Sequence, residues 1–369
     1  MALDWSRQSA HVSNNKSSQQ RPPVSTLMSL VALSGRSART LAARCLPPGV
    51  KGALKTSPLR TVIDSLEHLE ARVFSRGLSA NRVFELPIEY KIASASMSIV
   101  VPIHDAPSVT MRCLASLERD ATKSEVILVD DCSRITKTID LIQQFSSRNG
   151  WKVVRNEESR GHSAACAAGG RLASRPYLCL LNSDTVVTPW CWRAIQEAFE
   201  TDLAIGVAGP CTSFSGGNEQ TLDIARKCRF YWNDNQICAF AERLNVAPPQ
   251  PVIFDLPWVG GFAFFIRRSL WKELGGFDEN LADYANEVEL CIKVAKLGYR
   301  IVWVRSGYVH HFGGQSYGKK MSAREIKSRN LAGLRYIHNK DNCQSPTEIA
   351  RPQDGQACAV RSAQDVANL

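Results

Sequence analysis

The feature that most constrains the fold is a regular alternation of short apolar segments and helical patterns, which begins at Met97. Runs of apolar and β-branched residues predict strands at 97–102, 125–130, 151–155, 177–181 and 204–208. Apolar residues at helical spacing predict helices between them, at 108–118, 135–147, 163–173 and 189–199. Strands joined by helices of this length need right-handed crossovers. The sequence therefore predicts an α/β fold, with a mainly parallel sheet and helices on both faces.

The pattern becomes irregular after Pro210. A segment rich in Ser, Gly and Asn predicts a loop at 212–221. Later apolar patterns predict strands at 258–266 and 299–304 and helices at 284–297 and 322–338. We therefore divide the chain into a basic N-terminal extension at 1–95, a main domain at 96–320, and a C-terminal helix with a loose tail at 321–369.

The N-terminal extension is strongly basic. No acidic residue lies between Asp4 and Asp64, a stretch that holds nine lysines and arginines. Its Ser, Ala and Pro content is typical of a partly disordered arm. Two alternatives are an amphipathic helix at 25–46 that touches anionic lipid and an organellar transit peptide. Few aromatic residues separate the charges, so we do not expect nucleic-acid binding.

The cysteines and the apolar runs bear on the cellular setting. The chain has 12 cysteines, scattered without a C-x-x-C pair, and several lie inside apolar runs. This pattern favours free buried thiols over a disulfide framework or a zinc site. No apolar run approaches the length of about 20 residues that crosses a bilayer. We therefore expect a cytoplasmic protein, with peripheral contact at the inner face of a membrane through the basic arm.

Three of the predicted strands end in acidic segments. The first is followed by Asp105, the second ends in Asp130-Asp131, and the fourth ends in Asn182-Ser183-Asp184. In a doubly wound sheet these carboxyl ends meet at one crevice. An acid there either caps the next helix or turn, or holds a divalent cation against a diphosphate. Three such ends in consecutive units favour a site for a nucleotide and its metal.

Three further motifs contain residues that could bind a ligand or take part in catalysis. The Gly260-Gly261 pair either lets the backbone approach a ligand closely or marks a strand bulge. Glu287 and Glu289 lie two residues apart on a predicted helix, so they cannot share one face, and either one can point to the crevice. Neighbouring residues of a strand face opposite sides, so at most one of the His310-His311 pair meets the site. A neutral imidazole there can complete a metal shell.

In this order, the motifs resemble those of the family 2 glycosyltransferases of the GT-A fold. The matching segments are 101–107, 129–133, 180–185, 260–262, 275–279, 287–291 and 311–316. The resemblance covers about residues 97–318 and leaves out the N-terminal extension and the tail. It implies a GT-A type fold with a Rossmann-like sheet. It also implies an inverting, metal-assisted transfer of a hexose or deoxyhexose from a nucleotide-diphosphate-sugar to a hydroxyl of a glycan or lipid-linked acceptor, as in polysaccharide biosynthesis.

The resemblance also implies roles for individual residues. Glu287 matches the acid that serves as general base, with Glu289 as the alternative. Asp184 matches the second acid of the metal-binding Asp-x-Asp motif, and His311 matches the histidine near the metal, Mg²⁺ or Mn²⁺, and the diphosphate. The residues implied to bind the nucleotide-sugar are Pro102, Asp105, Asp130, Asp131, Asn182, Gly260 and Gly261.

The chain departs from the usual family pattern at four positions, which are Asp105, Ala167, Asn182 and the Asn286-Glu287 pair. Because Asn182 replaces an acid, Asp184 is the single carboxylate of its motif, and we expect weak metal binding without donor. These departures keep a non-catalytic nucleotide-sugar-binding protein as one alternative. A sugar-nucleotide pyrophosphorylase is another, although it needs a Gly-rich basic loop after the first strand, and 104–107 has no glycine.

Overall fold

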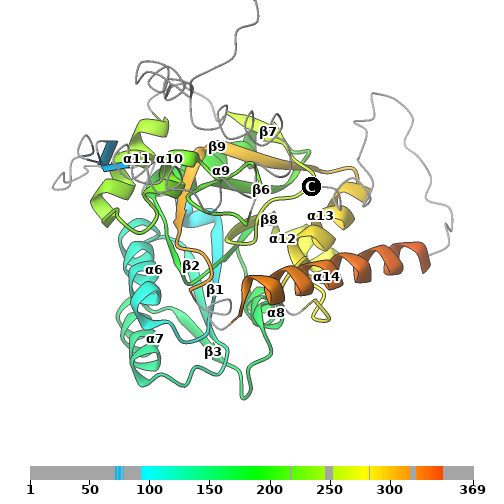
Figure 1. Cartoon of the computed structure of the whole chain (residues 1–369), viewed down its shortest axis with the longest axis horizontal. Coiled ribbons are helices and arrows are strands. Elements are labelled where there is room, and N and C mark those ends of the chain that lie inside the picture. Colours follow the sequence, from blue (N-terminus) through cyan, green and yellow to red (C-terminus); the bar gives the residue numbers. More distant parts are fainter. Residues whose placement is uncertain are drawn as a thin grey trace, which may run out of the picture. The chain divides into compact units, whose positions relative to one another are not determined.

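The computed structural model describes residues 71, 72, 74, 75, 78, 93–216, 218–245, 252–281, 283–315 and 321–343. Most of the basic arm and the C-terminal tail lie outside these residues. The described part is built around one nine-stranded sheet (Figure 1). No helix in this part of the chain is both long enough and apolar enough to cross a membrane.

The sheet has the order β3-β2-β1-β4-β8-β6-β9-β5, and β7 also pairs with β9. Its first four strands in sequence run parallel: β1 (Met97–Ile103), β2 (Glu125–Asp130), β3 (Lys152–Arg155) and β4 (Tyr177–Leu181). The remaining strands are β5 (Thr185–Val186), β6 (Ile205–Thr212), β7 (Ile253–Asp255), β8 (Ala263–Arg267) and β9 (Arg300–His311). All five strands predicted before Pro210 are present, as β1 to β4 and β6.

The second half of the sheet is mixed. β8 lies between β4 and β6 and is antiparallel to both, whereas β9 is parallel to β6. β5 and β7 pair with β9 in antiparallel fashion. The α/β prediction is confirmed, and the mainly parallel arrangement holds for β1 to β4. The direction of β8 could not be predicted, because its connection from β6 is not a simple crossover helix.

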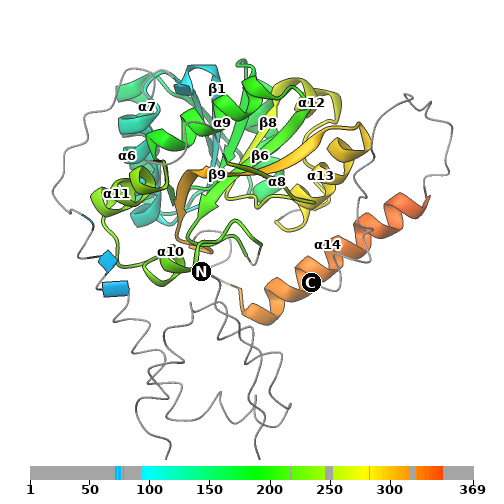
Figure 2. The same ribbon diagram turned by 90° about the horizontal axis from the view of Figure 1, so that it is seen from above.

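Helices cover both faces of the sheet, which explains why the central strands β1, β4, β6 and β8 are apolar on both sides. One apolar core joins the sheet to α6 (Pro107–Asp120), α7 (Thr136–Asn149) and α9 (Pro189–Thr201). A second core joins the other face to α8 (His162–Leu172), α12 (Arg268–Glu273) and α13 (Asn286–Lys296). Figure 2 shows α6 and α7 on one side of the sheet and α12 and α13 on the other. A short 3₁₀ helix, Ala93–Ser96, precedes β1.

Two helices, α10 (Asp223–Lys227) and α11 (Asp234–Asn245), were not predicted from the sequence. They form a third apolar cluster with Trp232 and with Tyr308 of β9. The described residues of the N-terminal extension contribute to it, since Phe74 packs there and Trp232 Nε1 donates a hydrogen bond to Ser75 Oγ at 2.8 Å. This part of the extension therefore belongs to the packed domain.

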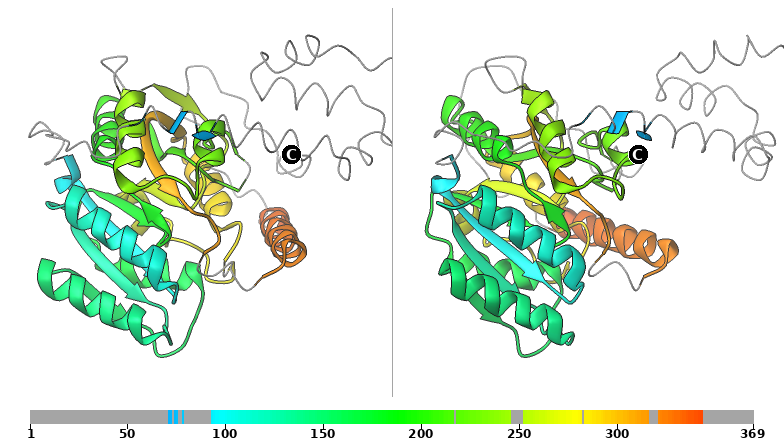
Figure 3. Two further views of the ribbon diagram at one scale, coloured as in Figure 1. Left: turned by 60° about the vertical axis from the view of Figure 1, so that its left-hand side comes forward. Right: turned by 90° about the vertical axis from the view of Figure 1, so that its left-hand side faces the viewer.

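The C-terminal helix α14 (Ala323–Cys343) confirms the helix predicted at 322–338. It lies outside the helices that cover the sheet (Figure 3). Its buried Ile337 packs with Leu281 and with Val288 of α13. Lys340 of α14 also makes an ion pair with Glu289. This helix therefore rests on the first turns of α13.

Helix α8 lies unusually close to the sheet because of Gly169. A Cβ atom added there would stand 2.4 Å from Cγ1 of Val100 and 2.9 Å from Cγ2 of Val129. Glycine in a helix interior costs about 1 kcal/mol relative to alanine. The close approach of α8 to β1 and β2 offsets that cost.

The substitution Gly169→Ala tests this packing by the sign of its effect. Helix propensity alone favours alanine by about 1 kcal/mol. We expect the opposite, a loss of about 1–3 kcal/mol in the free energy of unfolding, because the methyl group overlaps the two valines. Urea denaturation measures this. Arg171→Ala, on the exposed side of the same helix, should stay within about 0.5 kcal/mol of wild type. A stabilised Gly169→Ala variant would contradict the close approach.

Candidate active site

The acidic strand ends lie at one edge of the sheet. β1 pairs in parallel with β2 and with β4, and Ile103 at the end of β1 stands opposite Asp130 at the end of β2. The chain then leaves β4 and forms the two-residue strand β5, in which Thr185 pairs with His311 of β9. This short pairing places Asp184 directly beside His311.

The contact between Asp184 and His311 forms the centre of the site. Oδ1 of Asp184 lies 3.1 Å from Nε2 of His311. The backbone N–H of Gln315 donates to Oδ2 of Asp184 at 3.0 Å, and the N–H of Phe312 donates to its carbonyl oxygen at 2.9 Å. The side chain of Asp184 is only 2% exposed. The two residues predicted to face a metal are therefore adjacent and buried.

The hydrogen bonds of His311 define what its ring offers to Asp184. Its Nδ1 lies 2.6 Å from the carbonyl oxygen of Phe214, so Nδ1 carries a proton. In the neutral ring, Nε2 then carries a lone pair, which faces Oδ1 of Asp184. Both atoms are hydrogen-bond acceptors, so neither donates a proton to the other. A second proton on His311 or a cation between the two atoms would remove this mismatch, and Nδ2 of Asn182 lies 3.4 Å from the same Nε2.

The electrostatics favour an ionised Asp184. Burial acts to raise the pKa of Asp184, but the charge and hydrogen bond of a protonated His311 and the N–H of Gln315 outweigh it and lower the pKa. Without a proton on Nε2, the buried Oδ1 of Asp184 has no hydrogen-bond donor, and the buried Oδ1 of Asn182 has no partner in the protein. Carboxylate, amide and imidazole atoms of this kind fit a divalent cation.

The protein ligands available here are few. In the part of the chain that the structure describes, no group of three or more His, Cys, Asp or Glu side chains could hold a metal ion. Asp184 and His311 would therefore supply only part of a coordination shell. Mg²⁺ commonly binds through one or two carboxylates together with water and substrate phosphates. The residues present fit a cation that arrives with a phosphate ligand.

Glu287 lies in the first turn of α13 and faces Gly261. Its Cδ lies 3.7 Å from the position that a Cβ atom on Gly261 would take. Burial raises the pKa of Glu287 to about 7, against the opposing backbone hydrogen bonds of Glu287 and Gly261. A carboxylate with this pKa is suited to general-base catalysis near neutral pH. Asn286 anchors this turn, since its Nδ2 donates to Ser163 Oγ of α8 at 2.8 Å.

Glu289 has a different environment. Its carboxylate is buried and makes ion pairs with Lys293 at 2.8 Å and with Lys340 of α14 at 3.1 Å. These contacts link α13 to α14. Of the two acids, Glu287 is therefore the one whose carboxylate faces the glycine pair.

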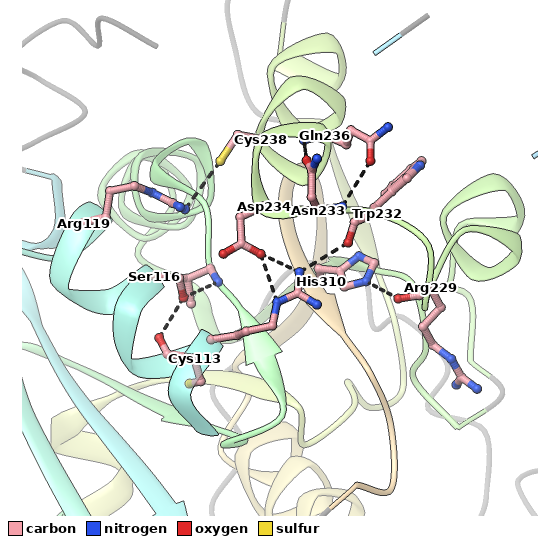
Figure 4. A network of polar contacts seen from close by, with 12 residues as sticks. Cys113, Ser116, Arg119, Arg229, Trp232, Asn233, Asp234, Gln236, Cys238 and His310 are labelled. Carbon is pink, nitrogen blue, oxygen red and sulfur yellow. Dashed lines mark hydrogen bonds and ion pairs between the residues drawn. The ribbon is translucent and has the colours of Figure 1, made fainter. Parts of the chain in front are cut away.

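His310 points to the opposite face of β9, as its position next to His311 requires. Its Nδ1 lies 2.9 Å from the hydroxyl of Tyr308. Its Nε2 lies 2.8 Å from the carbonyl oxygen of Arg229 (Figure 4). Burial lowers the pKa of His310 to about 3, so the ring is neutral. His310 thus holds the α10–α11 region against β9, and His311 is the one beside Asp184.

The acids at the ends of β1 and β2 have partners within the protein. The carboxylate of Asp131 accepts hydrogen bonds from Asn156 Nδ2 at 2.7 Å, Ser159 Oγ at 2.8 Å and the N–H groups of Arg160 and Gly161 at 3.0 and 3.1 Å. These bonds hold the loop before α8. A direct contact of Asp131 with a nucleoside stays a prediction.

Asp130 and Asp105 organise the segment before α7. Asp130 forms an ion pair with Arg155 and accepts the N–H of Ser133 at 2.8 Å. Oδ1 of Asp105 accepts the N–H groups at positions 134 and 135, at 2.8 and 2.9 Å. Pro102 is buried within β1 opposite Val129. These contacts agree with the turn alternative, and nucleoside binding by these residues also stays a prediction.

The Gly260-Gly261 pair lies outside β8, so the strand predicted at 258–266 begins only at Ala263. The N–H of Gly260 donates to Oε1 of the buried Gln220 at 2.6 Å instead of joining the ladder. Gly261 stands opposite Glu287. The pair therefore turns the backbone toward the acid.

Sequence reasoning missed the residues that hold His311 from the β6 side. Ser213 Oγ donates to the carbonyl oxygen of His311 at 2.8 Å, and the Phe214 carbonyl holds Nδ1. Phe262 stacks on the ring of His311, with 5.4 Å between centroids. Ser213 and Phe214 lie in a predicted loop without periodicity, so no sequence signal marked them.

Part of the chain is similar in sequence to known glycosyltransferases. Residues 98–273 match the family model described as "Glycosyl transferase family 2". The O-antigen biosynthesis protein RfbC of Myxococcus xanthus is 25% identical over 267 residues, which are 66% of this chain and 20% of that protein. An N-acetylglucosaminyl-diphospho-decaprenol L-rhamnosyltransferase of Mycobacterium tuberculosis (strain ATCC 25618 / H37Rv) is 36% identical over 62 residues, 17% of this chain and 20% of that protein. The chain thus spans about a fifth of the length of each.

A solved structure also resembles this chain. It is the mannosyltransferase PcManGT from Pyrobaculum calidifontis in complex with GDP-Man and Mn²⁺. The TM-score is 0.49 at 16% sequence identity, and the match covers 77% of this chain and 75% of that chain.

The raised pKa of Glu287 predicts a pH-dependent stability. The folded pKa of about 7 lies above the ordinary value of 4.5, so the folded state loses stability as the pH rises from 4.5 to 7. Glu287→Gln removes this loss. Above pH 7, we expect the variant to unfold with a free energy about 3 kcal/mol higher than that of wild type.

Urea denaturation across this pH range measures the effect. The difference should vanish below pH 4.5, where both states of the wild type are protonated. The exposed Glu158→Gln should change the free energy of unfolding by less than about 0.5 kcal/mol at every pH. A Glu287→Gln variant that is less stable than wild type above pH 7 would contradict a Glu287 whose pKa is raised by burial.

Proposed function

Because residues 98–273 match the glycosyl transferase family 2 model, we propose that this protein transfers a sugar from a nucleotide-diphosphate-sugar to a hydroxyl of a glycan or lipid-linked acceptor. One observation carries the proposal. Gly261 meets the carboxylate of Glu287, and the next residue, Phe262, stacks on His311. A single backbone segment thus connects a carboxylate of raised pKa to the Asp184–His311 pair.

Glu287 is the proposed general base. The oxygen of the acceptor hydroxyl attacks C1 of the sugar, and its proton passes to the Glu287 carboxylate. The bond between C1 and the phosphate oxygen breaks, and its electron pair leaves with the nucleoside diphosphate. Attack from the face opposite the leaving group inverts C1. Gly261 has no side chain, so the acceptor can approach the Glu287 carboxylate.

Asp184 and His311 are the proposed holders of a divalent cation, Mg²⁺ or Mn²⁺. When bound, the cation would offset the charge that develops on the departing diphosphate. His311 keeps its Nε2 aimed at Asp184 because Phe214 fixes Nδ1 and Phe262 supports the ring face. The few protein ligands support the view that donor and cation bind together.

The names of the relatives support a substrate class. One acts in O-antigen biosynthesis and another is a rhamnosyltransferase, so a hexosyl or deoxyhexosyl transfer in polysaccharide biosynthesis is the proposal for this chain. A donor screen that measures release of nucleoside diphosphate with Mg²⁺ or Mn²⁺ tests it. No turnover of any donor, with Asp184→Ala indistinguishable from wild type in nucleotide binding, would contradict it.

The role of Glu287 predicts a specific kinetic change. Removing a general base typically lowers the rate by about 10²–10⁴-fold, so Glu287→Gln should lower kcat by that factor and leave the donor KM nearly unchanged. In wild type, kcat should rise with pH and level off above about 7, where Glu287 is ionised. Glu289→Gln is the matched control and should keep this pH profile. If Glu289→Gln abolishes the profile instead, the base is Glu289.

The role of Asp184 predicts a change in metal dependence. Asp184→Asn should raise the Mn²⁺ concentration that gives half-maximal activity about tenfold or more, which corresponds to at least about 1.4 kcal/mol. Titration of Mn²⁺ in the turnover assay measures it. In wild type, Mn²⁺ should bind weakly until the donor is added. Tight binding of Mn²⁺ to the free protein would contradict this site.

A further inference from the structure

Arg229 lies between α10 and α11, in a position that neither the sequence motifs nor the proposed chemistry has used. Its guanidinium stacks on two aromatic rings, 4.5 Å from the centroid of Phe214 and 4.4 Å from that of Phe230. The residue is half-buried. Stacking on rings uses the flat faces of the guanidinium, so the N–H groups at its edge stay available to a hydrogen-bond acceptor.

The backbone of Arg229 is fixed independently of its side chain. Its carbonyl oxygen lies 2.8 Å from Nε2 of the buried His310. Figure 4 shows the side chain of Arg229 extending away from this contact. The buried, neutral ring of His310 thus fixes the backbone of Arg229, while the guanidinium of Arg229 extends in another direction.

The guanidinium reaches the segment that surrounds Asp184. Nη1 of Arg229 lies 3.1 Å from the position that a Cβ atom on Gly313 would take. Gly313 stands between His311 and Gln315, which both contact the carboxylate of Asp184. A side chain at position 313 would collide with Phe214 at 2.4 Å, so glycine keeps this approach open.

Phe214 couples Arg229 to the candidate metal ligand. Its carbonyl oxygen binds Nδ1 of His311 at 2.6 Å, while its ring carries the guanidinium. One residue therefore orients both the imidazole and the cation. Burial lowers the pKa of Arg229, and the charge of Asp184 opposes this shift, so the two side chains interact electrostatically.

Arg229 differs from its neighbours in its ion pairs. Arg226 pairs with Asp223 at 3.4 Å, and Arg112 pairs with Asp234. Among the described residues, no carboxylate lies within ion-pair distance of Arg229, and its guanidinium stacks on two rings and interacts at longer range with Asp184. Half-burying an arginine without a carboxylate is costly unless an anion completes the site.

We propose that Arg229 binds the diphosphate of the nucleotide-sugar donor, beside the cation held by Asp184 and His311. This inference rests on the proposed function and adds a residue to it. When the bond to C1 breaks, the diphosphate gains one negative charge. The guanidinium offsets that charge through hydrogen bonds from the N–H groups at its edge. These groups lie in one plane and can bind two phosphate oxygens at once, which an ammonium group does less well.

The test compares nucleotide binding to the full chain by calorimetry in the presence of Mn²⁺. UDP, GDP and dTDP are titrated into wild type, and the tightest of them is compared with its monophosphate. We expect Arg229→Gln to weaken the diphosphate about tenfold or more, and the monophosphate by less than about threefold. Arg229→Lys should give an intermediate loss.

Arg226→Gln is the matched control, because it removes the same charge from an exposed arginine that is one turn away and already paired. It should bind both nucleotides as wild type does. An unchanged affinity of Arg229→Gln for the diphosphate would overturn the inference. An equal loss for diphosphate and monophosphate, or the same loss in Arg226→Gln, would also overturn it, since the effect would then be structural or a general effect of charge.

The variants also separate this inference from the proposed function. If wild type binds none of the three diphosphates, the proposed function itself fails, and the role of Arg229 fails with it. If wild type binds one of them and Arg229→Gln binds it equally well, only the role of Arg229 fails. If Arg229→Gln does not fold, the diphosphate affinity of Arg229→Lys is the test, because lysine keeps the positive charge and lacks the planar set of N–H donors. An affinity equal to that of wild type would then overturn the inference.

Discussion

The site depends on the pairing of two residues of β5 with the end of β9. This pairing brings Asp184, which follows β4, into contact with His311, which lies 127 positions later in the chain. It buries a carboxylate against an imidazole whose other nitrogen already has a partner. A buried contact between two acceptors is unfavourable, and a proton or a cation between them would relieve it. The pairing of β5 with β9 thus produces a site that a positive charge would stabilise.

The remaining elements position groups around this contact. The Gly261-Phe262 segment faces the carboxylate of Glu287 through Gly261 and stacks on His311 through Phe262. Phe214 fixes the imidazole by its carbonyl and Arg229 by its ring. The site therefore holds a carboxylate of raised pKa, a carboxylate of lowered pKa, and a guanidinium with aromatic support. Different environments give two similar acids opposite behaviour.

Much of this arrangement could be predicted from the sequence, and the limits have physical causes. The strands β1 to β4 and the helices between them have local periodicity, which burial on a covered sheet requires. The direction of β8 depends on a long, irregular connection and has no local signal. The acids Asp105, Asp130 and Asp131 are read equally well as turn residues or ligands, and the structure gives each a partner within the protein.

The sequence by itself determined the α/β class, the order of the acidic strand ends and the resemblance that family comparison confirmed, because these follow from residue type and spacing. Only the tertiary structure decided which member of each ambiguous pair faces the site. Glu287 rather than Glu289 meets Gly261, and His311 rather than His310 meets Asp184. The reason is that a side chain's partner, burial and pKa come from elements distant in the chain, and no local pattern records them.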